Sequence, residues 1–443
     1  MQFAQKEQRR SSPADEARPG LRGYLRAAGP GLVTGASDDD PSGIATYAQA
    51  GARFQYGLLW ASLLTLPLMG AVQEICDRTA LATGRTLGDL AIRRFPRWKP
   101  GLWVLLSALL VANVLNITAD IVAVGEGMHL LHAGPASLWA VLGGLLVTAV
   151  LIVGTFETIA RAFKFLCFAL LTYLVVMFAA GASWPSVLGH TVVPHVELTK
   201  EYMLLLVAVL GTTISPYLFF WQNAHRIEDL RNEPEGGSDP VPLRQRSSHA
   251  ATRKERTSRA DVFAGMTFSN AVMFAIIVST GATLGAHGHT TITSAAQAAQ
   301  ALRPIAGGLS ETLFALGFIG SGMLAIPVLA GAGSVGISGM LHKEWGFSRS
   351  VREAPVFYGL VLVGTLGGTL LTLFGVDPIK LLVYSALING LLAAPFLILV
   401  MILSDDRDTM GDHANGRIAH ALGWLTAALM AVAAIAYVVL NYG

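Results

Sequence analysis

The sequence predicts an all-α integral membrane protein of about eleven spans. Of its 443 residues, 53% are hydrophobic and 14% are charged, and the mean hydropathy is +0.54. Soluble domains carry roughly 25% charged residues, so a water-soluble fold could not bury this much apolar surface. Hydrophobic runs of about 20 residues recur along the whole chain, and each is long enough to cross a hydrocarbon core of about 30 Å.

The spans are taken as the apolar runs between polar linkers. They are expected at 28–54, 57–77, 101–131, 136–156, 163–182, 202–225, 261–285, 308–340, 354–374, 378–403 and 419–441. Residues 1–27 are polar and Arg-rich without a cleavable apolar segment, which predicts a cytoplasmic tail. Residues 229–259 lack apolar periodicity and predict a disordered cytoplasmic loop. Cys76 and Cys167 have no metal-ligand spacing and predict neither a disulfide nor a thiolate site.

The basic residues predict the orientation of the chain. With the N-terminus in the cytoplasm, all but four of the 31 Lys and Arg residues fall on cytoplasmic segments. The exceptions are Arg53, Lys200, Arg303 and Lys380. This asymmetry obeys the positive-inside rule and favours an odd number of spans with the C-terminus outside. The composition, rich in Arg, Ala and Gly, indicates a bacterial inner membrane.

The first span contains three consecutive acids, Asp38, Asp39 and Asp40. About ten apolar or small residues precede them, and a helix rises about 15 Å over that length, so the acids fall near mid-membrane. A charge there costs at least about 2.5–3.5 kcal/mol. Pro41 and Ser42 favour an unwound stretch that aims the carboxylates into a protein cavity. The alternative is a span that begins after Pro41, with the acids as a surface cap.

The sixth span carries a second interruption, at Pro216, again about eleven residues into an apolar run. Pro41 and Pro216 therefore occupy corresponding positions in two five-span sets, 28–182 and 202–403, followed by a linker and an eleventh helix in 404–443. Paired interruptions are typical of inverted-repeat transporters, whose substrate site lies where the broken helices meet. A simple kink at Pro216 is the alternative.

Five parts of the sequence carry a resemblance to a known family. They are Gly29-Pro-Gly-Leu, the segment from Asp40 to Ala52, Asp120, Gly211-Thr-Thr-Ile-Ser-Pro-Tyr217, and Ser404-Asp-Asp-Arg-Asp-Thr-Met-Gly411. In these the chain resembles the NRAMP family (natural resistance-associated macrophage proteins), which are proton-coupled divalent metal transporters. The resemblance covers nearly the whole chain. It implies a LeuT-type 5+5 inverted repeat with an eleventh helix, and with helices 1 and 6 broken.

The resemblance also implies which residues form the site. Asp40 matches the metal-binding aspartate, and Thr212 matches a position whose backbone carbonyl can coordinate the ion. Asp120 matches an acid of the third span.

The motifs differ from the family pattern at other positions. Gly43 stands where the family has a ligand Asn, Ser215 where it has a ligand Met, and Tyr217 where it has a His. Ala123 replaces a second acid of the third span. The chain is similar in these respects to bacterial members described as magnesium transporters.

The altered residues predict a preference for hard cations. Ser215 removes the only soft donor, and Gly43 removes an amide oxygen and is expected to enlarge the pocket. Asp38 and Asp39 add negative charge near Asp40. An all-oxygen site suits Mg²⁺ or Mn²⁺, which is expected as the transported substrate, and no cofactor is implied.

The residues available for proton coupling are few. Asp120, Glu126 and Tyr217 form the candidate proton or ion path, but Asp120 and Glu126, six residues apart, face different directions. Tyr217 does not exchange protons near neutral pH. Transport is therefore expected to be uncoupled or weakly coupled to protons.

Three other functions compete with this expectation. A standard proton-coupled Mn²⁺/Fe²⁺ importer is one alternative, and an amino-acid or amine carrier of the same fold is another. Three aspartates would repel the carboxylate of an amino acid, which favours a metal cation. The sequence lacks a phosphate-binding Gly loop and a His-Glu-x-x-His motif, so no enzyme is predicted. The expected partners are the ion and the lipid bilayer, with no nucleic acid and no obligate protein.

Overall fold

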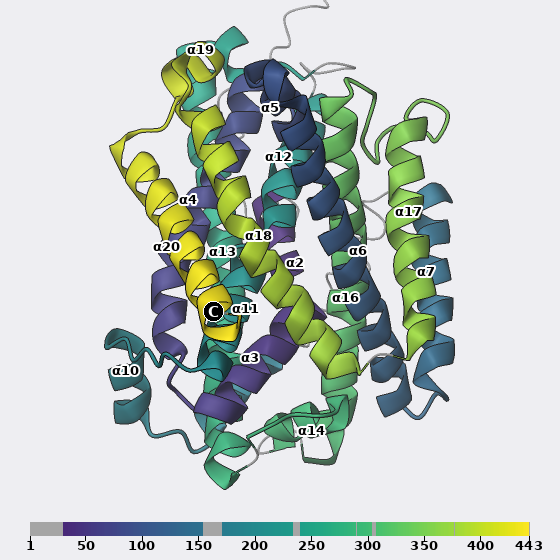
Figure 1. Cartoon of the computed structure of the whole chain (residues 1–443), viewed down its shortest axis with the longest axis vertical. Coiled ribbons are helices and arrows are strands. Elements are labelled where there is room, and N and C mark those ends of the chain that lie inside the picture. Colours follow the sequence, from purple (N-terminus) through teal and green to yellow (C-terminus); the bar gives the residue numbers. More distant parts are fainter. Residues whose placement is uncertain are drawn as a thin grey trace, which may run out of the picture.

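Figure 1 shows a helical bundle in a computed structural model of the chain. The structure describes residues 30–153, 171–233, 240–288, 290–303, 307–375 and 377–442. Within these ranges the regular structure is helical, without a strand, which confirms the predicted all-α fold. The tail 1–27, Cys167 and residues 163–170 of the expected fifth span, 163–182, lie outside the described residues.

Most of the expected spans are single long helices. They are α4 (Leu59–Thr83), α6 (Lys99–Leu130), α7 (Ala136–Val153), α13 (Ser248–Thr283), α16 (Ser310–Met340), α17 (Pro355–Leu371), α18 (Pro378–Asp405) and α20 (Arg417–Tyr442). Together with the sixth span, nine described stretches are long and apolar enough to cross a membrane. The first span, which contains three consecutive acids, is not among the nine, and of the fifth span the structure describes α9 (Leu171–Ala179).

Pairs of shorter helices form the first and sixth spans. They are α2 (Pro30–Asp38) with α3 (Pro41–Phe54), and α11 (Lys200–Thr213) with α12 (Pro216–Arg231). Asp39 and Asp40 separate the first pair, and Ile214 and Ser215 separate the second. The second helix of each pair begins with proline, whose missing N–H has no helical partner at that position. The predicted breaks in helices 1 and 6 are confirmed.

Short helices connect the spans. The α-helical ones are α5 (Leu87–Arg94), α10 (Trp184–Val192), α14 (Ala295–Ala299) and α19 (Arg407–Met410). Single turns of 3-10 helix are η2 (Pro96–Trp98), η4 (Leu243–Gln245), η5 (Gly285–His287), η6 (Gln300–Leu302), η7 (Gly307–Leu309), η8 (Thr372–Phe374) and η9 (Gly411–His413).

The prediction of a disordered loop over 229–259 is wrong for much of its length. α12 continues to Arg231, and α13 begins at Ser248, so the last third of the predicted loop is helical. Tertiary ion pairs supply the order that the local sequence does not indicate. Lys254 Nζ lies 2.9 Å from Asp229 Oδ2 and 2.6 Å from Glu233 Oε1, which ties the start of α13 to the end of α12.

α13 is the helix that holds the first break in place. It packs along α2, α3 and α4, while α11 packs on α18 and α6 on α16. A side chain at Gly35 would collide with the backbone of Gly265, so these two glycines allow α2 and α13 to touch directly. Ser269 lies one turn beyond Gly265, and this contact brings it to the break.

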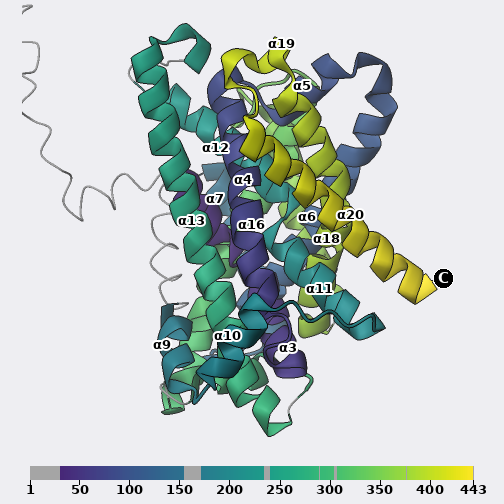
Figure 2. The same cartoon turned by 90° about the vertical axis from the view of Figure 1, so that its left-hand side faces the viewer.

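The outermost helices carry the lipid-facing surface. Leu146 on α7 and Val363 on α17 are each 56% exposed, and Val432 on α20 is 66% exposed. α7 and α17 lie at the right edge of the bundle in Figure 1, and α20 runs along its outside at the right of Figure 2. Large apolar side chains in such positions fit a multi-pass membrane protein, with the polar groups gathered at its centre.

Candidate metal site

The two helix breaks face each other in the middle of the bundle. Tyr217, in the first turn of α12, places its hydroxyl 3.3 Å from the backbone carbonyl of Ser37 and 3.5 Å from Asp40 Oδ2. The remaining two half-helices also meet, because Gly43 of α3 lies against Thr212 of α11. The sequence placed these residues at corresponding mid-span positions, and the structure brings them together.

Asp40 caps α3 and keeps one carboxylate oxygen available. Its Oδ1 accepts hydrogen bonds from the backbone N–H of Gly43 (2.7 Å) and from Ser42 Oγ (2.6 Å). Among the residues that the structure describes, the hydrogen-bond contact of its Oδ2 is the long one with Tyr217. The residue is 1% exposed, so this oxygen faces a protein interior rather than bulk water.

Asp38 and Asp39 turn toward α13 instead. Ser269 Oγ lies 2.5 Å from Asp38 Oδ2 and 3.2 Å from Asp39 Oδ1. The other carboxylate oxygen of each residue is buried without a hydrogen-bond partner among the described residues. Within the described parts of the chain, no group of three or more His, Cys, Asp or Glu side chains converges on one point. The three acids therefore do not form a single three-carboxylate cluster.

Hydroxyl and carbonyl oxygens complete the surroundings of Asp40. Ser215 Oγ donates to the carbonyls of Gly211 (2.5 Å) and Thr212 (3.0 Å), so it bends back onto α11. Thr212 Oγ1 and the Tyr47 hydroxyl are buried without a hydrogen-bond partner among the described residues. Such oxygens are hard donors that a cation can use.

Gly43 does not open the space that the sequence suggested. A Cβ at this position would lie 3.0 Å from Thr212 Oγ1 and 3.3 Å from the carbonyl oxygen of Asp38. The gap left by the missing side chain is thus taken up by the close approach of α3 to α11. The loss of side-chain volume brings a hydroxyl to the break rather than enlarging a pocket.

The two acids of the candidate path are separated. Asp120 on α6 is fully buried, and both its carboxylate oxygens lack hydrogen-bond partners among the described residues. Its backbone carbonyl and the ring of Pro41 both approach Gly322 of α16, so this turn of α6 borders the first break. Glu126 lies farther along α6, is partly exposed, and interacts electrostatically with His129. The structure brings Asp120 and Tyr217 to the site, and leaves Glu126 outside it.

Sequence reasoning missed Tyr47 and Ser269. Tyr47 lies on α3, one turn after Gly43, inside the segment from Asp40 to Ala52 that resembles the family, where the sequence indicates no role for the phenol. Ser269 is a single hydroxyl within the apolar run of α13. A serine in such a run gives no local signal of its partners, which here are more than 200 residues away.

A second buried polar group, which we call the Asp77 network, lies at one end of the bundle. Asp77 Oδ1 on α4 accepts hydrogen bonds from Gln222 Nε2 (2.6 Å) and Arg226 Nε (2.7 Å), both on α12. Gln222 also accepts a hydrogen bond from Thr34 on α2 (2.5 Å).

The network also reaches α13. Asp77 Oδ2 accepts from Ser258, and Arg226 pairs with Asp261 at 3.3 Å. Asp261 in turn accepts from the backbone N–H of Gly31 on α2 at 2.8 Å. These contacts tie α2 to α4, α12 and α13.

Comparison with known proteins shows similarity along the whole chain. The profile of a family described as natural resistance-associated macrophage protein-like matches residues 31–440. The divalent metal cation transporter MntH of Verminephrobacter eiseniae is 27% identical over 90% of this chain and 85% of its own length. That of Klebsiella pneumoniae (strain 342) is 27% identical over 92% of both chains.

Solved structures share the fold. The Eremococcus coleocola manganese transporter superposes with a TM-score of 0.74 and 18% identity, covering 94% of this chain and 86% of that one. Mhp1, a nucleobase-cation-symport-1 family transporter, superposes with a TM-score of 0.54 and 15% identity over 93% and 91% of the two chains. At these identities the likeness concerns the arrangement of helices.

Proposed function

The chain belongs to the Nramp family, and from that premise we propose that it is a secondary transporter that moves divalent metal cations across the cytoplasmic membrane by alternating access. Members of this family are transporters, so the chain is a carrier rather than an enzyme. The observation that carries the proposal is the Asp40 carboxylate. It is buried where two broken helices meet, and within the described part of the chain its Oδ2 has Tyr217, at 3.5 Å, as its hydrogen-bond donor. We take the orientation from the Lys and Arg distribution, with the N-terminus in the cytoplasm.

The charges around the break favour a cation as the substrate. Asp38, Asp39 and Asp40 are all buried, and no Lys or Arg pairs with them among the described residues. Buried carboxylates without a basic partner are costly unless a cation or a proton neutralises them. An amino-acid carrier of the same fold would instead need a positive environment for the substrate carboxylate.

The donor set favours a hard ion, Mg²⁺ or Mn²⁺. The Tyr217 hydroxyl lies 3.5 Å from Asp40 Oδ2 and 3.3 Å from the Ser37 carbonyl. Thr212 Oγ1 and the Tyr47 ring lie beside Gly43, whose N–H binds the other oxygen of the same carboxylate. The polar side-chain atoms of these residues are all oxygens, and thioether sulfur, which would select softer metals, is absent from the motif at Ser215. The relatives named as divalent metal cation transporters, and the manganese transporter of the same fold, support Mn²⁺ as a substrate.

Uptake into proteoliposomes tests the substrate and the role of Ser215 together. We expect Mn²⁺ influx to be inhibited by excess Mg²⁺ more strongly than by Cd²⁺, and to be unaffected by amino acids. Ser215→Met introduces a soft donor and should reverse the order, so that Cd²⁺ inhibits more strongly than Mg²⁺. Ser215→Ala, which removes the hydroxyl without adding sulfur, is the matched control. Strong Cd²⁺ preference in the unmodified protein would contradict the hard-ion proposal, and inhibition by amino acids would contradict metal transport.

We further propose that metal transport is at most weakly coupled to protons. Asp120 is the acid of the third span that borders the break, and Ala123 occupies the position one turn later where a second acid would stand. Glu126, the next carboxylate on α6, lies away from the site. Tyr217 offers a hydroxyl at neutral pH rather than a group that gains and loses a proton.

A pH-sensitive dye inside proteoliposomes measures the coupling directly. Metal binding to a carboxylate site can release protons by itself, so the readout must be sustained acidification that follows the rate of Mn²⁺ entry. We expect Mn²⁺ uptake with little change in lumenal pH, and uptake that varies weakly with an imposed pH gradient. Robust acidification in proportion to uptake would contradict weak coupling and leave metal transport intact. If acidification is seen, its loss in Asp120→Asn would assign the proton flux to this residue.

A further inference from the structure

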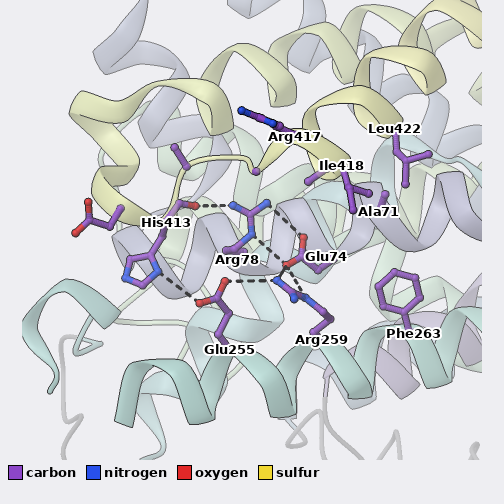
Figure 3. A pocket seen from close by; sticks show the side chains of 14 residues that line it. Ala71, Glu74, Arg78, Glu255, Arg259, Phe263, His413, Arg417, Ile418 and Leu422 are labelled. Atoms are coloured by element: carbon purple, nitrogen blue, oxygen red, sulfur yellow. Dashed lines mark hydrogen bonds and ion pairs between the residues drawn. The ribbon is translucent and has the colours of Figure 1, made fainter. Parts of the chain in front are cut away.

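A groove of about 740 Å³ opens on the outer surface between α4, α13 and α20 (Figure 3). α13 and α20 each pack on α4, which forms the floor between them, and Figure 2 shows the two helices on either side of it. The groove lies at the end of the bundle that holds the starts of α13 and α20. The Lys and Arg distribution assigns this end to the cytoplasmic side.

On all three helices, the residues that line the groove change from charged at the end of the bundle to apolar toward its middle. Figure 3 shows the labelled charged side chains gathered at one part of the groove and the apolar ones at another. Along α13, Glu255 and Arg259 are followed by Phe263, and along α20, Arg417 is followed by Leu422. The apolar lining residues nearest the middle of the bundle are Ala71 of α4, Phe263 of α13 and Leu422 of α20. An elongated molecule with a polar head and an apolar tail matches this order.

Most charges in the groove neutralise one another. Arg78 lies 3.1 Å from Glu74 Oε1, and its Nη1 donates to the His413 carbonyl at 2.5 Å. Arg259 pairs with Glu74 at 3.1 Å and with Glu255 at 3.6 Å, while its side chain stays half exposed.

Two charged lining residues make no ion pair with any residue that the structure describes. Arg417, the first residue of α20, is one, and Asp412, in the connecting segment before α20, is the other. The groove therefore presents one unpaired cation beside its apolar part and one unpaired anion beyond the helix end.

We propose that this groove binds one phospholipid with a primary-amine headgroup from the cytoplasmic leaflet. The phosphate would meet Arg417, with the half-exposed Arg259 as a second donor, because guanidinium groups bind phosphate oxygens in pairs. The ammonium group lies beyond the phosphate in such a lipid and would meet Asp412. An acyl chain would cover Phe263 and Ile418, which are 37% and 77% exposed. The two unpaired charges and the apolar part of the groove thus each have a counterpart in the ligand.

Native mass spectrometry of the full-length protein tests the proposal. The protein is extracted from liposomes of equal parts phosphatidylethanolamine, phosphatidylglycerol and phosphatidylcholine, and the lipids that it retains are counted. We expect one retained phosphatidylethanolamine in preference to the other two lipids. Arg417→Ala should lower retention of phospholipid about fivefold, the effect of one basic residue at a membrane surface. Asp412→Asn should keep phospholipid bound but abolish the preference for the amine headgroup.

Two further variants separate the groove from general effects. Arg97→Ala removes an exposed arginine elsewhere on the chain and should leave retention unchanged. Ala419→Trp fills the apolar part without changing a charge and should reduce retention of all three lipids. Equal retention by the unmodified protein and Arg417→Ala would overturn the proposal, as would a preference for phosphatidylglycerol or phosphatidylcholine. A full chain that retains no lipid until residues 1–27 are removed would show that the tail fills the groove, and would overturn it too.

Discussion

Asp40→Asn is expected to lower the affinity for Mn²⁺ by more than about 100-fold and to abolish uptake. Loss of residues that only orient a metal ligand typically costs 10–100-fold in affinity, so loss of a direct carboxylate should cost more. Asparagine still provides an oxygen that can cap α3, where Asp40 now accepts from the Gly43 N–H. The charge is therefore removed with little change in the local backbone. Calorimetry with Mn²⁺ and Mg²⁺ measures the affinity, and proteoliposome uptake measures transport.

Asp40→Ala removes the charge and the cap together. It should lose metal binding to the same extent and also lose about 1 kcal/mol of stability from the missing cap. Asp377 offers a matched control, because it also caps a helix that begins with proline, accepting from the Lys380 N–H at 3.1 Å. Asp377→Ala should lower stability similarly and leave metal affinity unchanged. Binding by Asp40→Asn within about threefold of the unmodified protein would move the ion elsewhere, with Asp38 and Asp39 beside Ser269 as the next candidates.

Arg226→Met is expected to give the largest loss of stability outside the metal site. The Arg226 side chain is 4% exposed and Asp77 is 2% exposed, so the substitution leaves a buried carboxylate without its cation. Removing one partner of a buried ion pair typically costs about 3–5 kcal/mol. Because the Asp77 network ties α2 to three other helices, the same change should also loosen that end of the bundle. Thermal unfolding in detergent measures the first effect.

Thiol labelling measures the second effect. Cys76 is fully buried next to Asp77, and a Cys167→Ser background leaves it as the only cysteine. Arg226→Met should make Cys76 react faster with a water-soluble maleimide. Arg256→Met removes an exposed arginine that is not part of the Asp77 network, so it should change neither the thermal unfolding nor the rate of Cys76 labelling. Unchanged labelling in Arg226→Met, together with lowered stability, would show that the network supports the fold without holding α2 in place.

The helix breaks were predictable because their cause is local. Proline at positions 41 and 216 and acids in mid-span conflict with a continuous apolar helix wherever the rest of the chain lies. The structure resolves this conflict at both places with a non-helical stretch covered by protein, rather than with a surface cap at Pro41 or a simple kink at Pro216. The pairing of the two breaks in space followed from their corresponding positions in two sets of spans.

Contacts set by distant parts of the chain were not predictable in the same way. Asp77 and Arg226 fall at the ends of expected spans, where charged residues are ordinary, and nothing local indicates that they meet. The sequence predicts a disordered loop at the start of α13 because its charges follow no apolar period, while its order comes from ion pairs with Asp229 and Glu233. The division of the three acids, with Asp40 apart from Asp38 and Asp39, depends on Ser269 and is likewise tertiary.

The double use of the Asp40 carboxylate has a mechanical consequence. One oxygen fixes the first turn of α3, and the other is the oxygen proposed for the ion. A carboxylate is rigid, so rotation to improve its hold on a cation must stretch the bonds to Ser42 and the Gly43 N–H. Ion binding and the tilt of α3 therefore depend on the same carboxylate, and an ion too large or too small for the free oxygen would displace α3.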